Sequence, residues 1–402
     1  MKNPLHHAFA ASLGAASLLV LASASAPVAR ADSPSWRIGM SGAMTGPAQG
    51  LGLGMKAGIE AYFHAVNQTG GVHGKPLELI ALDDAYEPGR AGPNMRRLID
   101  VDHAFAILGN PGTPTAAVAV PIANEKKVPF FGPFTGAGLL RKTPPERYIV
   151  NFRASYAQET AEMVRGLVED LGIAPADIGF FTQNDAYGDS GYDGGVAALK
   201  AHGYLAAERL PHGRYPRNTV DVEGGLATLL DPTVHPQAII MVGAYKPCAK
   251  FIKLAKQKGL HVIFANVSFV IGDALNRELG PDGDGVVVTQ VVPPPDGDLP
   301  VLREYRLAID PKDASFISLE GFIAAKAFVE TLRRAGPGVT HDSFITALED
   351  GRPFDLGLGV THILSPQQHQ FSSRVWPTVI RGGKFHAMAS WRDLRRLAGS
   401  TP

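Results

Sequence analysis

The side chains best placed for chemistry are hydroxyls, amides and aromatic rings that directly follow apolar runs of the chain. If those runs are strands of parallel sheets, their ligands bind beyond the strands' carboxyl ends. The residues in such places are Ser41, Thr45, Thr113, Thr115, Phe134 and Thr135 in the first half, and Asn184, Asp185, Tyr187, Tyr245, Asn266 and Ser268 in the second. This set can hydrogen-bond to a small solute and stack on it, but it offers no nucleophile paired with a base. The residues therefore predict binding without catalysis.

Motifs of enzyme chemistry are weak. Gly50-Leu51-Gly52-Leu53-Gly54 lacks the spacing of a dinucleotide fingerprint, and no glycine precedes the Lys-Ser or Lys-Thr pair of a P-loop. Asp83 and Asp84 are adjacent at a predicted strand end, where capping or an ion pair is the simpler interpretation. The 13 histidines are scattered and none has the spacing of a metal site. We expect no cofactor and no metal.

Each binding candidate also has a purely structural interpretation. A threonine after a strand caps a helix about as often as it binds a ligand, which applies to Thr113 and Thr115. Tyr187 and Tyr245 could pack between domains, although both lie in loops that contain glycine. Phe134 could belong to the core. The sequence leaves these alternatives open.

Repeated strand-loop-helix units must position these residues. The first unit has a strand at 38–40, a turn rich in hydroxyls and glycine, and a helix over 51–67 that ends at Gly70-Gly71. The strands are apolar runs instead of alternations, which is typical of a parallel sheet covered on both faces. Further strands are predicted at 77–82, 105–108, 128–131 and 148–152, and then, after a helix capped by Ser155, at 178–182, 204–210, 238–242, 262–264 and 286–291. The pattern predicts two doubly wound α/β domains.

The last quarter of the chain departs from this repeat. Residues 292–300 contain three consecutive prolines and read as a linker. An apolar helix is predicted over 316–335. Two short strands at 377–380 and 385–389 flank Arg381-Gly382-Gly383-Lys384, which indicates a hairpin.

Composition and the chain start bear on location. The 402 residues carry 38 basic and 38 acidic side chains, so charge gives no case for nucleic acid or a membrane surface. Residues 1–31, with an apolar run over 8–24 and Ala29-Arg30-Ala31, fit a cleaved secretory signal. The run is short of the roughly 20 residues that span a bilayer. Cys248, the single cysteine, is expected to be inert; it excludes an internal disulfide and lies too far from the signal to carry a lipid. We expect a free periplasmic protein.

Several motifs together resemble a known family. They are Ile38–Pro47 followed by Gly52–Gly74, the strand end Leu82-Asp83-Asp84, and Tyr187-Gly188 after a strand. They resemble type I periplasmic solute-binding proteins, most closely the branched-chain amino-acid (leucine/isoleucine/valine) binding branch of ABC importers. The resemblance covers nearly the whole chain after the signal.

The resemblance implies two doubly wound parallel-sheet lobes joined by three crossovers, which close on a solute like a Venus flytrap. Lobe 1 would be 32–152 with 293–358, and lobe 2 would be 153–292 with 359–402. It also implies a monomer that serves the transmembrane permease subunits of an ABC transporter, which a cytoplasmic ATPase drives. The alternatives are a sensor subunit with the same fold that regulates a membrane or signalling partner, and an enzyme on a similar scaffold.

The resemblance further implies a binding site. Thr113, Thr135 and the amide of Gly136 match the loops that hold a ligand carboxylate, and Tyr187 and Tyr245 match tyrosines of the second lobe. Leu51 stands where the family often has an aromatic wall, and Ser268 stands where amino-acid binders place an acid for the ligand ammonium. The family's disulfide positions fall at Tyr86 and Gly112. With Phe134 as a further wall, the site suits an amino-acid-like solute, an apolar or aromatic carboxylate, or an amide.

Overall fold

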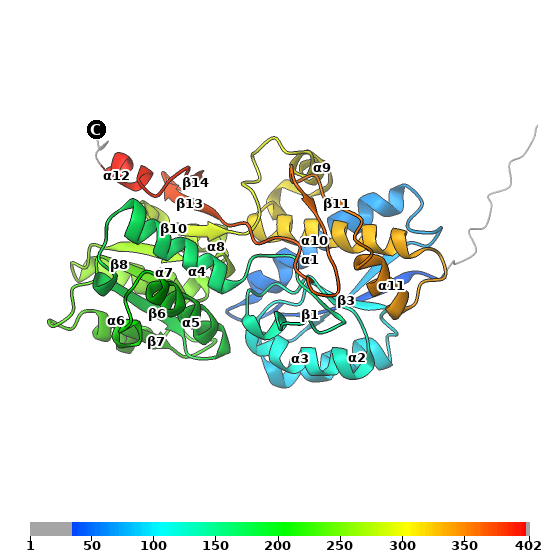
Figure 1. The fold of residues 1–402 in the computed structure, drawn as a ribbon, viewed down its shortest axis with the longest axis horizontal. Coiled ribbons are helices and arrows are strands. Elements are labelled where there is room, and N and C mark those ends of the chain that lie inside the picture. Colours follow the sequence, from blue (N-terminus) through cyan, green and yellow to red (C-terminus); the bar gives the residue numbers. More distant parts are fainter. Residues whose placement is uncertain (1–33, 399–402) are drawn as a thin grey trace, which may run out of the picture. The chain divides into compact units, whose positions relative to one another are not determined.

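The computed structural model describes residues 34–398 and contains two large sheets, one wholly parallel and one mostly parallel (Figure 1). The predicted signal over 1–31 lies outside the described residues. The first sheet has five strands in the order β2-β1-β3-β4-β5, all paired in parallel. Its strands are β1 (Trp36–Gly42), β2 (Leu77–Asp83), β3 (Ala106–Leu108), β4 (Phe130–Phe131) and β5 (Ile149–Val150). Its helices are α1 (Gln49–Gln68), α2 (Pro88–Asp100), α3 (Thr113–Lys126), α9 (Pro300–Ala308), α10 (Phe316–Ala335) and α11 (His341–Leu348).

The second sheet has seven strands in the order β14-β13-β10-β9-β8-β6-β7. Its strands are β6 (Ile178–Gln183), β7 (His212–Tyr215), β8 (Ala238–Val242), β9 (Ile263–Asn266), β10 (Val287–Gln290), β13 (Trp376–Arg381) and β14 (Lys384–Ala387). Its helices are α4 (Tyr156–Arg165), α5 (Ala186–Ala201), α6 (Glu223–Leu229), α7 (Tyr245–Gln257), α8 (Gly272–Leu279) and α12 (Asp393–Ala398). The predicted hairpin is confirmed: β13 and β14 pair with each other, and β13 joins β10 in antiparallel fashion.

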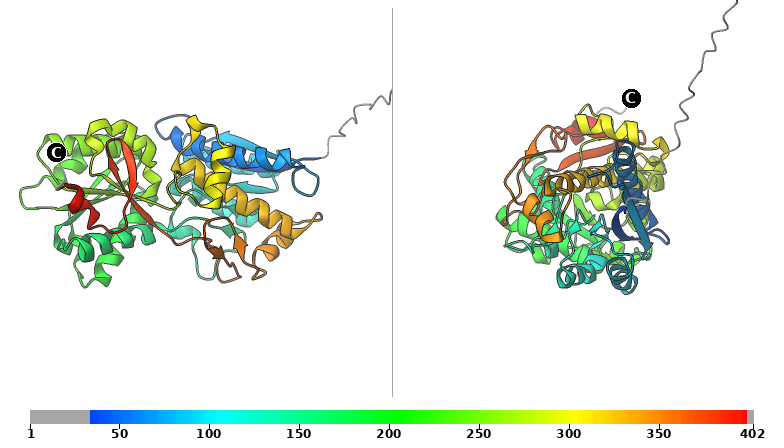
Figure 2. Two further views of the ribbon diagram at one scale, coloured as in Figure 1. Left: turned by 90° about the horizontal axis from the view of Figure 1, so that it is seen from above. Right: turned by 90° about the vertical axis from the view of Figure 1, so that its right-hand side faces the viewer.

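Helices lie on both faces of each sheet (Figures 1 and 2). Around the first sheet, α2 and α3 pack together on one face while α1 and α10 pack together on the other. Glycines allow α1 and α10 to approach closely, because a Cβ atom added at Gly58 would lie 1.8 Å from the carbonyl oxygen of Ser318. Strand β8 is buried along its whole length, as expected of a strand covered on both faces. Both sheets are doubly wound, as predicted.

Three chain segments connect the sheets. The chain leaves β5 for α4, returns after β10 to α9, and crosses again before β13. The first and third crossovers run side by side, since Asn151 bridges Gln370 and the amide of Ser372 donates to the carbonyl of Phe152 over 2.9 Å. A small hairpin of β11 (Phe354–Asp355) and β12 (Thr361–His362) precedes the third crossover. The predicted fold of two doubly wound sheets joined by three crossovers is confirmed.

Some elements differ from the sequence predictions. The strand predicted at 204–210 is wrong: that segment holds a 3₁₀ turn, Ala207–Arg209, and the strand β7 follows Pro211. The partly polar sequence of β7 hides it, because this strand lies at the sheet's edge and alternates between buried and half-buried residues. Helices α9 and α11 were not predicted. The cap at Ser155 is confirmed, since its hydroxyl accepts from the amide of Gln158.

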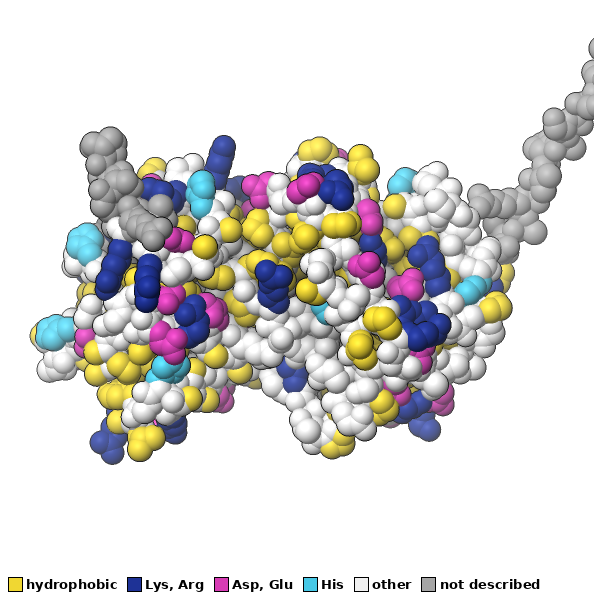
Figure 3. Space-filling model, turned by 45° about the horizontal axis from the view of Figure 1, so that its top comes forward, with side chains coloured by type: hydrophobic (Ala, Val, Ile, Leu, Met, Phe, Trp, Pro, Cys, Tyr) yellow, Lys and Arg dark blue, Asp and Glu magenta, His cyan; other side chains and the backbone are white. Residues whose placement is uncertain are grey.

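Surface charge is evenly mixed. On the face in Figure 3, basic and acidic side chains are interspersed and form no field of a single sign. Among the described residues, no helix is both long enough and apolar enough to cross a bilayer.

Candidate functional site

Two of the predicted site residues, Phe134 and Tyr187, meet around one buried ring, that of Phe269. This residue belongs to the 3₁₀ turn Ser268–Val270, which follows β9. The ring of Phe134 stacks on it with centroids 5.2 Å apart, and the ring of Tyr187 lies 4.5 Å away. All three rings are at most 2% exposed. The loop after β4 in the first sheet and the starts of helices in the second therefore meet at Phe269.

Two further tyrosines complete the enclosure. Tyr86 follows β2 and its ring lies 6.2 Å from that of Phe269; Tyr156 begins α4 and its ring lies 6.3 Å away. We call Tyr86, Phe134, Tyr156 and Tyr187 the aromatic cage. Two of its members come from the first sheet and two from α4 and α5, so Phe269 fills the space between loops of both sheets.

The predicted hydroxyls lie beside this cage. Thr113 and Thr135 are both fully buried, and their hydroxyl oxygens are 2.7 Å apart. The carbonyl of Gly136 accepts from the amide of Tyr156 over 2.8 Å. The hydroxyl of Tyr156 has no hydrogen-bond partner, whereas that of Tyr187 donates to the carbonyl of Gly243 over 3.2 Å.

A buried charge cluster adjoins the cage, formed by Arg153, Glu159 and Glu320. Arg153 lies in the first crossover and is fully buried. Its Nη2 donates to Glu159 over 3.3 Å and contacts the hydroxyl oxygen of Ser268; its Nε lies 3.7 Å from a carboxylate oxygen of Glu320. The guanidinium carbon is 4.6 Å from the ring centroid of Phe134. The Nε and Nη1 atoms of Arg153 have no hydrogen-bond partner.

The two acids of the cluster differ in the number of hydrogen bonds that their carboxylates accept. Glu159 accepts from the amide of Ser268 over 2.7 Å, from its hydroxyl over 2.9 Å and from the hydroxyl of Thr289 over 2.6 Å. Within residues 34–398, the side chain of Glu320 makes only the long ion pair to Arg153. Burial raises the pKa of Glu320 to about 7, and the charge of Arg153 opposes that rise. Ser268 thus lies against a carboxylate, although it is not itself an acid.

Leu51 and Tyr245 lie away from the aromatic cage. Leu51 is buried in the first turn of α1 and packs in the core. Tyr245 is the first residue of α7 and is 7% exposed. Its ring faces α1, since a Cβ atom added at Gly50 would lie 3.7 Å from Cε1 of Tyr245. These two residues lie near each other at the helix starts of α1 and α7.

The remaining polar candidates have local roles. Asp83 accepts from the amides of Met44, Thr45 and Ala85 and pairs with Arg90, which agrees with the expected capping and ion pair. Thr115 donates to the carbonyl of Pro111 over 2.7 Å, and Asp185 caps α5. An ion pair also joins loops of the two sheets: Arg217, after β7, contacts Glu87 at the start of α2 over 2.7 Å.

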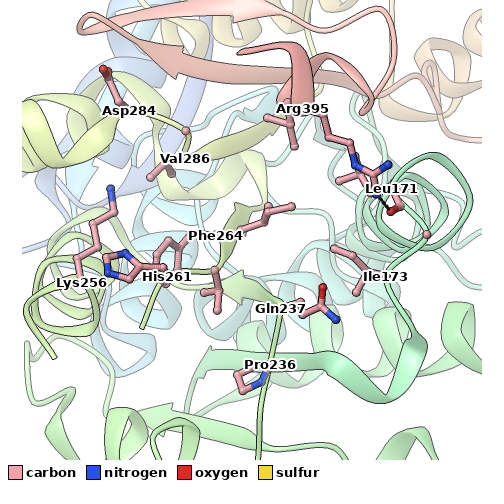
Figure 4. A pocket seen from close by; sticks show the side chains of 15 residues that line it. Leu171, Ile173, Pro236, Gln237, Lys256, His261, Phe264, Asp284, Val286 and Arg395 are labelled. Carbon is pink, nitrogen blue, oxygen red and sulfur yellow. Dashed lines mark hydrogen bonds between the residues drawn. The ribbon is translucent and has the colours of Figure 1, made fainter. Parts of the chain in front are cut away.

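Little space remains beside the cage. Two cavities of about 10 Å³ each adjoin it, one lined by Tyr86 and Gln183 and the other by Phe134, Gln290 and Glu320. Each holds about one water molecule. A larger cavity of about 600 Å³ lies at the amino ends of β8, β9 and β10 (Figure 4). Ligands of parallel sheets bind at the opposite edge, so this cavity is not the candidate site.

Sequence reasoning missed Phe269, Tyr86, Tyr156 and the charge cluster. Some signals were present: Arg153 directly follows a strand end, and Glu320 interrupts the apolar helix α10. No group of His, Cys, Asp and Glu side chains in residues 34–398 is arranged to hold a metal ion.

Two doubly wound sheets, three crossovers and a ring of aromatic and polar residues between the sheets define a type I solute-binding protein. The chain belongs to the periplasmic binding protein family, whose model matches residues 35–384.

Its relatives carry related descriptions. A structure from Rhodopirellula baltica SH 1, described as a possible leucine/isoleucine/valine-binding protein, is 48% identical, with a TM-score of 0.87 over 90% of this chain and 98% of that one. A substrate-binding periplasmic protein from Ralstonia solanacearum is 28% identical, with a TM-score of 0.77 over 86% and 97%. Leu/Ile/Val-binding protein homolog 7 of Brucella abortus (strain 2308) is 25% identical over 72% of this chain and 75% of its own length.

Proposed function

We propose that this protein is the periplasmic substrate-binding component of an ABC importer. It captures one small solute between its two lobes by hinge closure, and the closed form delivers that solute to the permease subunits. The solute is amino-acid-like, or an apolar or aromatic carboxylate, or an amide. The carrying observation is that aromatic residues from both sheets, Phe134 on one side and Tyr187 on the other, meet around Phe269.

The absence of catalysis is part of the proposal. The hydroxyls of Thr113 and Thr135 bond to each other, and the hydroxyl of Ser268 is held by the carboxylate of Glu159. Neither arrangement presents a hydroxyl that is activated by a histidine or lysine base. The site therefore suits recognition of a solute whose covalent bonds stay unchanged.

The proposed hinge lies in the three chain segments that cross between the two sheets. The two lobes are the regions packed on the five-stranded and seven-stranded sheets, and the three crossovers provide the bending segments. The ion pair between Arg217 and Glu87 supports the closed form, because it joins loops that belong to different sheets. Its partners are 26% and 42% exposed, so opening costs little at this contact.

The test is a binding screen on the purified protein. A panel of amino acids, aromatic and short-chain carboxylates and amides is screened by thermal shift, because a ligand that binds only the folded form raises its melting temperature. Hits are then measured by calorimetry with Tyr187→Ala, which we expect to lose affinity while it remains folded, and with Tyr245→Ala, which tests whether the site extends to the start of α7. Tyr192→Ala serves as the control, since Tyr192 lies on α5 and stacks on His212 of β7 and on none of the cage residues.

Two results would count against the proposal. Affinity retained by both tyrosine variants would remove these residues from the site. Chemical conversion of a bound solute would replace the proposal with an enzymatic one.

A further inference from the structure

We propose that the solute is an aromatic carboxylate without an ammonium group, whose ring takes the place of Phe269 in the aromatic cage and whose carboxylate pairs with Arg153. This inference rests on the proposed function and narrows its ligand class. It is drawn from two features that adjoin each other, a cage filled by a side chain of the protein itself and a buried guanidinium with unused donors.

The cage already fits an aromatic ring. Phe269 is 1% exposed and contacts rings on several sides, stacked on Phe134 at 5.2 Å and tilted against Tyr187 at 4.5 Å. Aromatic pairs at these separations contribute favourable energy beyond the area that they bury. A planar solute in the same place would regain these contacts, whereas a branched aliphatic solute would regain only the burial.

The segment that carries Phe269 holds backbone strain. The 3₁₀ turn Ser268–Val270 ends at Ile271, whose φ is 58°. A β-branched residue rarely adopts this left-handed conformation, which costs free energy that the surrounding packing must offset. If Phe269 leaves the cage, this turn must rearrange. A rearrangement that moves Ile271 out of the left-handed conformation removes its unfavourable free energy and so offsets part of the lost packing.

Arg153 supplies the anion site. It is fully buried, and its Nε and Nη1 atoms have no hydrogen-bond partner. Buried donors without acceptors are costly, and Nη1, which hydrogen-bonds to neither acid of the cluster, can donate to a carboxylate of a solute. The guanidinium borders the cage, because it contacts the hydroxyl of Ser268, the residue before Phe269, and its carbon lies 4.6 Å from the ring centroid of Phe134.

The same cluster disfavours a ligand ammonium. Glu159 already accepts from two atoms of Ser268, from Thr289 and from Arg153. Glu320 is the remaining acid, and a ligand carboxylate beside Arg153 would favour its neutral, protonated form. An ammonium group would then be buried close to a guanidinium of the same charge, which is unfavourable.

The experiment compares matched solutes by calorimetry on the whole protein. The pairs are 3-phenylpropanoate with L-phenylalanine, which differ in the ammonium; benzoate with benzamide, which differ in charge; and benzoate with cyclohexanecarboxylate, which differ in aromaticity. We expect the first member of each pair to bind at least about tenfold more tightly.

Variants test the two features separately. Phe269→Ala removes the side chain that competes for the cage, so we expect benzoate to bind about tenfold more tightly to it than to the wild type. The matched control is Phe105→Ala, a half-buried ring packed on Trp36 in the first sheet, which should leave affinity unchanged. Arg153→Gln should abolish the preference for benzoate over benzamide; if that variant fails to fold, the wild-type comparison of the same pair still decides the point.

The outcomes separate this inference from the proposed function. Tight binding of L-leucine or L-phenylalanine with weak binding of the aromatic acids would overturn the inference and leave the importer component standing. Unchanged or weaker benzoate binding by Phe269→Ala would also overturn it. If no small solute binds to the folded protein, the proposed function fails and the inference fails with it.

Discussion

Replacing Glu159 by glutamine should cost the protein a large part of its stability. Glu159 is fully buried, and its two oxygens accept from the amide and hydroxyl of Ser268, the hydroxyl of Thr289 and the guanidinium of Arg153. Glutamine has nearly the same shape but presents an NH₂ group where an acceptor is needed. It also removes the negative charge that lies closest to the buried Arg153.

The magnitude follows from these contacts. Breaking one partner of a buried ion pair costs about 3–5 kcal/mol, because the remaining charge is left uncompensated. Glu320 offsets only part of this, since it contacts Arg153 at 3.7 Å without a hydrogen bond. Domains are stable by about 5–15 kcal/mol in total, so Glu159→Gln should remove at least about a fifth of the stability of a typical domain.

The assay is urea unfolding at pH 7, followed by circular dichroism, with the slope of free energy against denaturant held as a check on the two-state assumption. The control is Glu169→Gln, because Glu169 is 55% exposed and pairs with His202 at the surface. Such a surface pair contributes at most about 1 kcal/mol. A loss below about 1 kcal/mol for Glu159→Gln, similar to the control, would refute the argument that this carboxylate anchors the buried cluster.

Three further predictions concern other parts of the molecule. Gly58→Ala should destabilise the protein by about 3 kcal/mol or more in urea unfolding, because the added Cβ would overlap the carbonyl of Ser318; Gly92→Ala, in open space on α2, should be neutral or stabilising. Burial raises the pKa of Glu320 to about 7, so the folded state binds this proton more readily than the unfolded state and the stability contributed by this residue falls as pH rises from about 4.5 to 7. Between pH 5 and pH 8, Glu320→Gln should therefore gain about 2–3 kcal/mol relative to the wild type, and a gap that stays constant with pH would contradict this. Burial also raises the pKa of the Cys248 thiol well above its usual value, so a disulfide reagent such as Ellman's reagent should modify it only after unfolding; rapid labelling of the native protein would show the thiol to be accessible.

The sheets were predictable because their signal is local. Parallel strands covered on both faces are apolar runs, and β8 and α10 have the bounds that the sequence predicted. Helices α9 and α11 were missed because they are only nine and eight residues long and follow proline- and glycine-rich segments. Strand β7 was misplaced because an edge strand carries a polar sequence that a buried strand would not.

The sequence predicted that the loops after the strands would lie together, but not which side chains fill the space between them. Residues after strands do meet at one place, because the carboxyl ends of parallel strands share an edge of the sheet. Phe269 gave no signal, since a phenylalanine next to a buried strand is ordinary core in any sequence. The contact of Glu159 with Ser268 joins residues 109 positions apart, and the contact of Glu159 with Thr289 spans 130. Only the packing of α4 against the ends of β9 and β10 creates these pairs, and no local pattern encodes them.

The long-range contact between Ser268 and Glu159 changes how the site is interpreted. The sequence has a serine where the resemblance leads one to expect an acid, and this alone predicts a site without a counter-charge for an ammonium. A carboxylate does lie there, that of Glu159, but its charge is matched by Arg153 and its oxygens are already used by Ser268 and Thr289. The acid is therefore present and already occupied within the protein, while two nitrogens of the arginine are not. Glu320 accepts no hydrogen bond from the described residues either, but burial raises its pKa to about 7 and so favours its neutral form. The charged group with unused donors is therefore Arg153, and the group on a solute that best complements it is an anion.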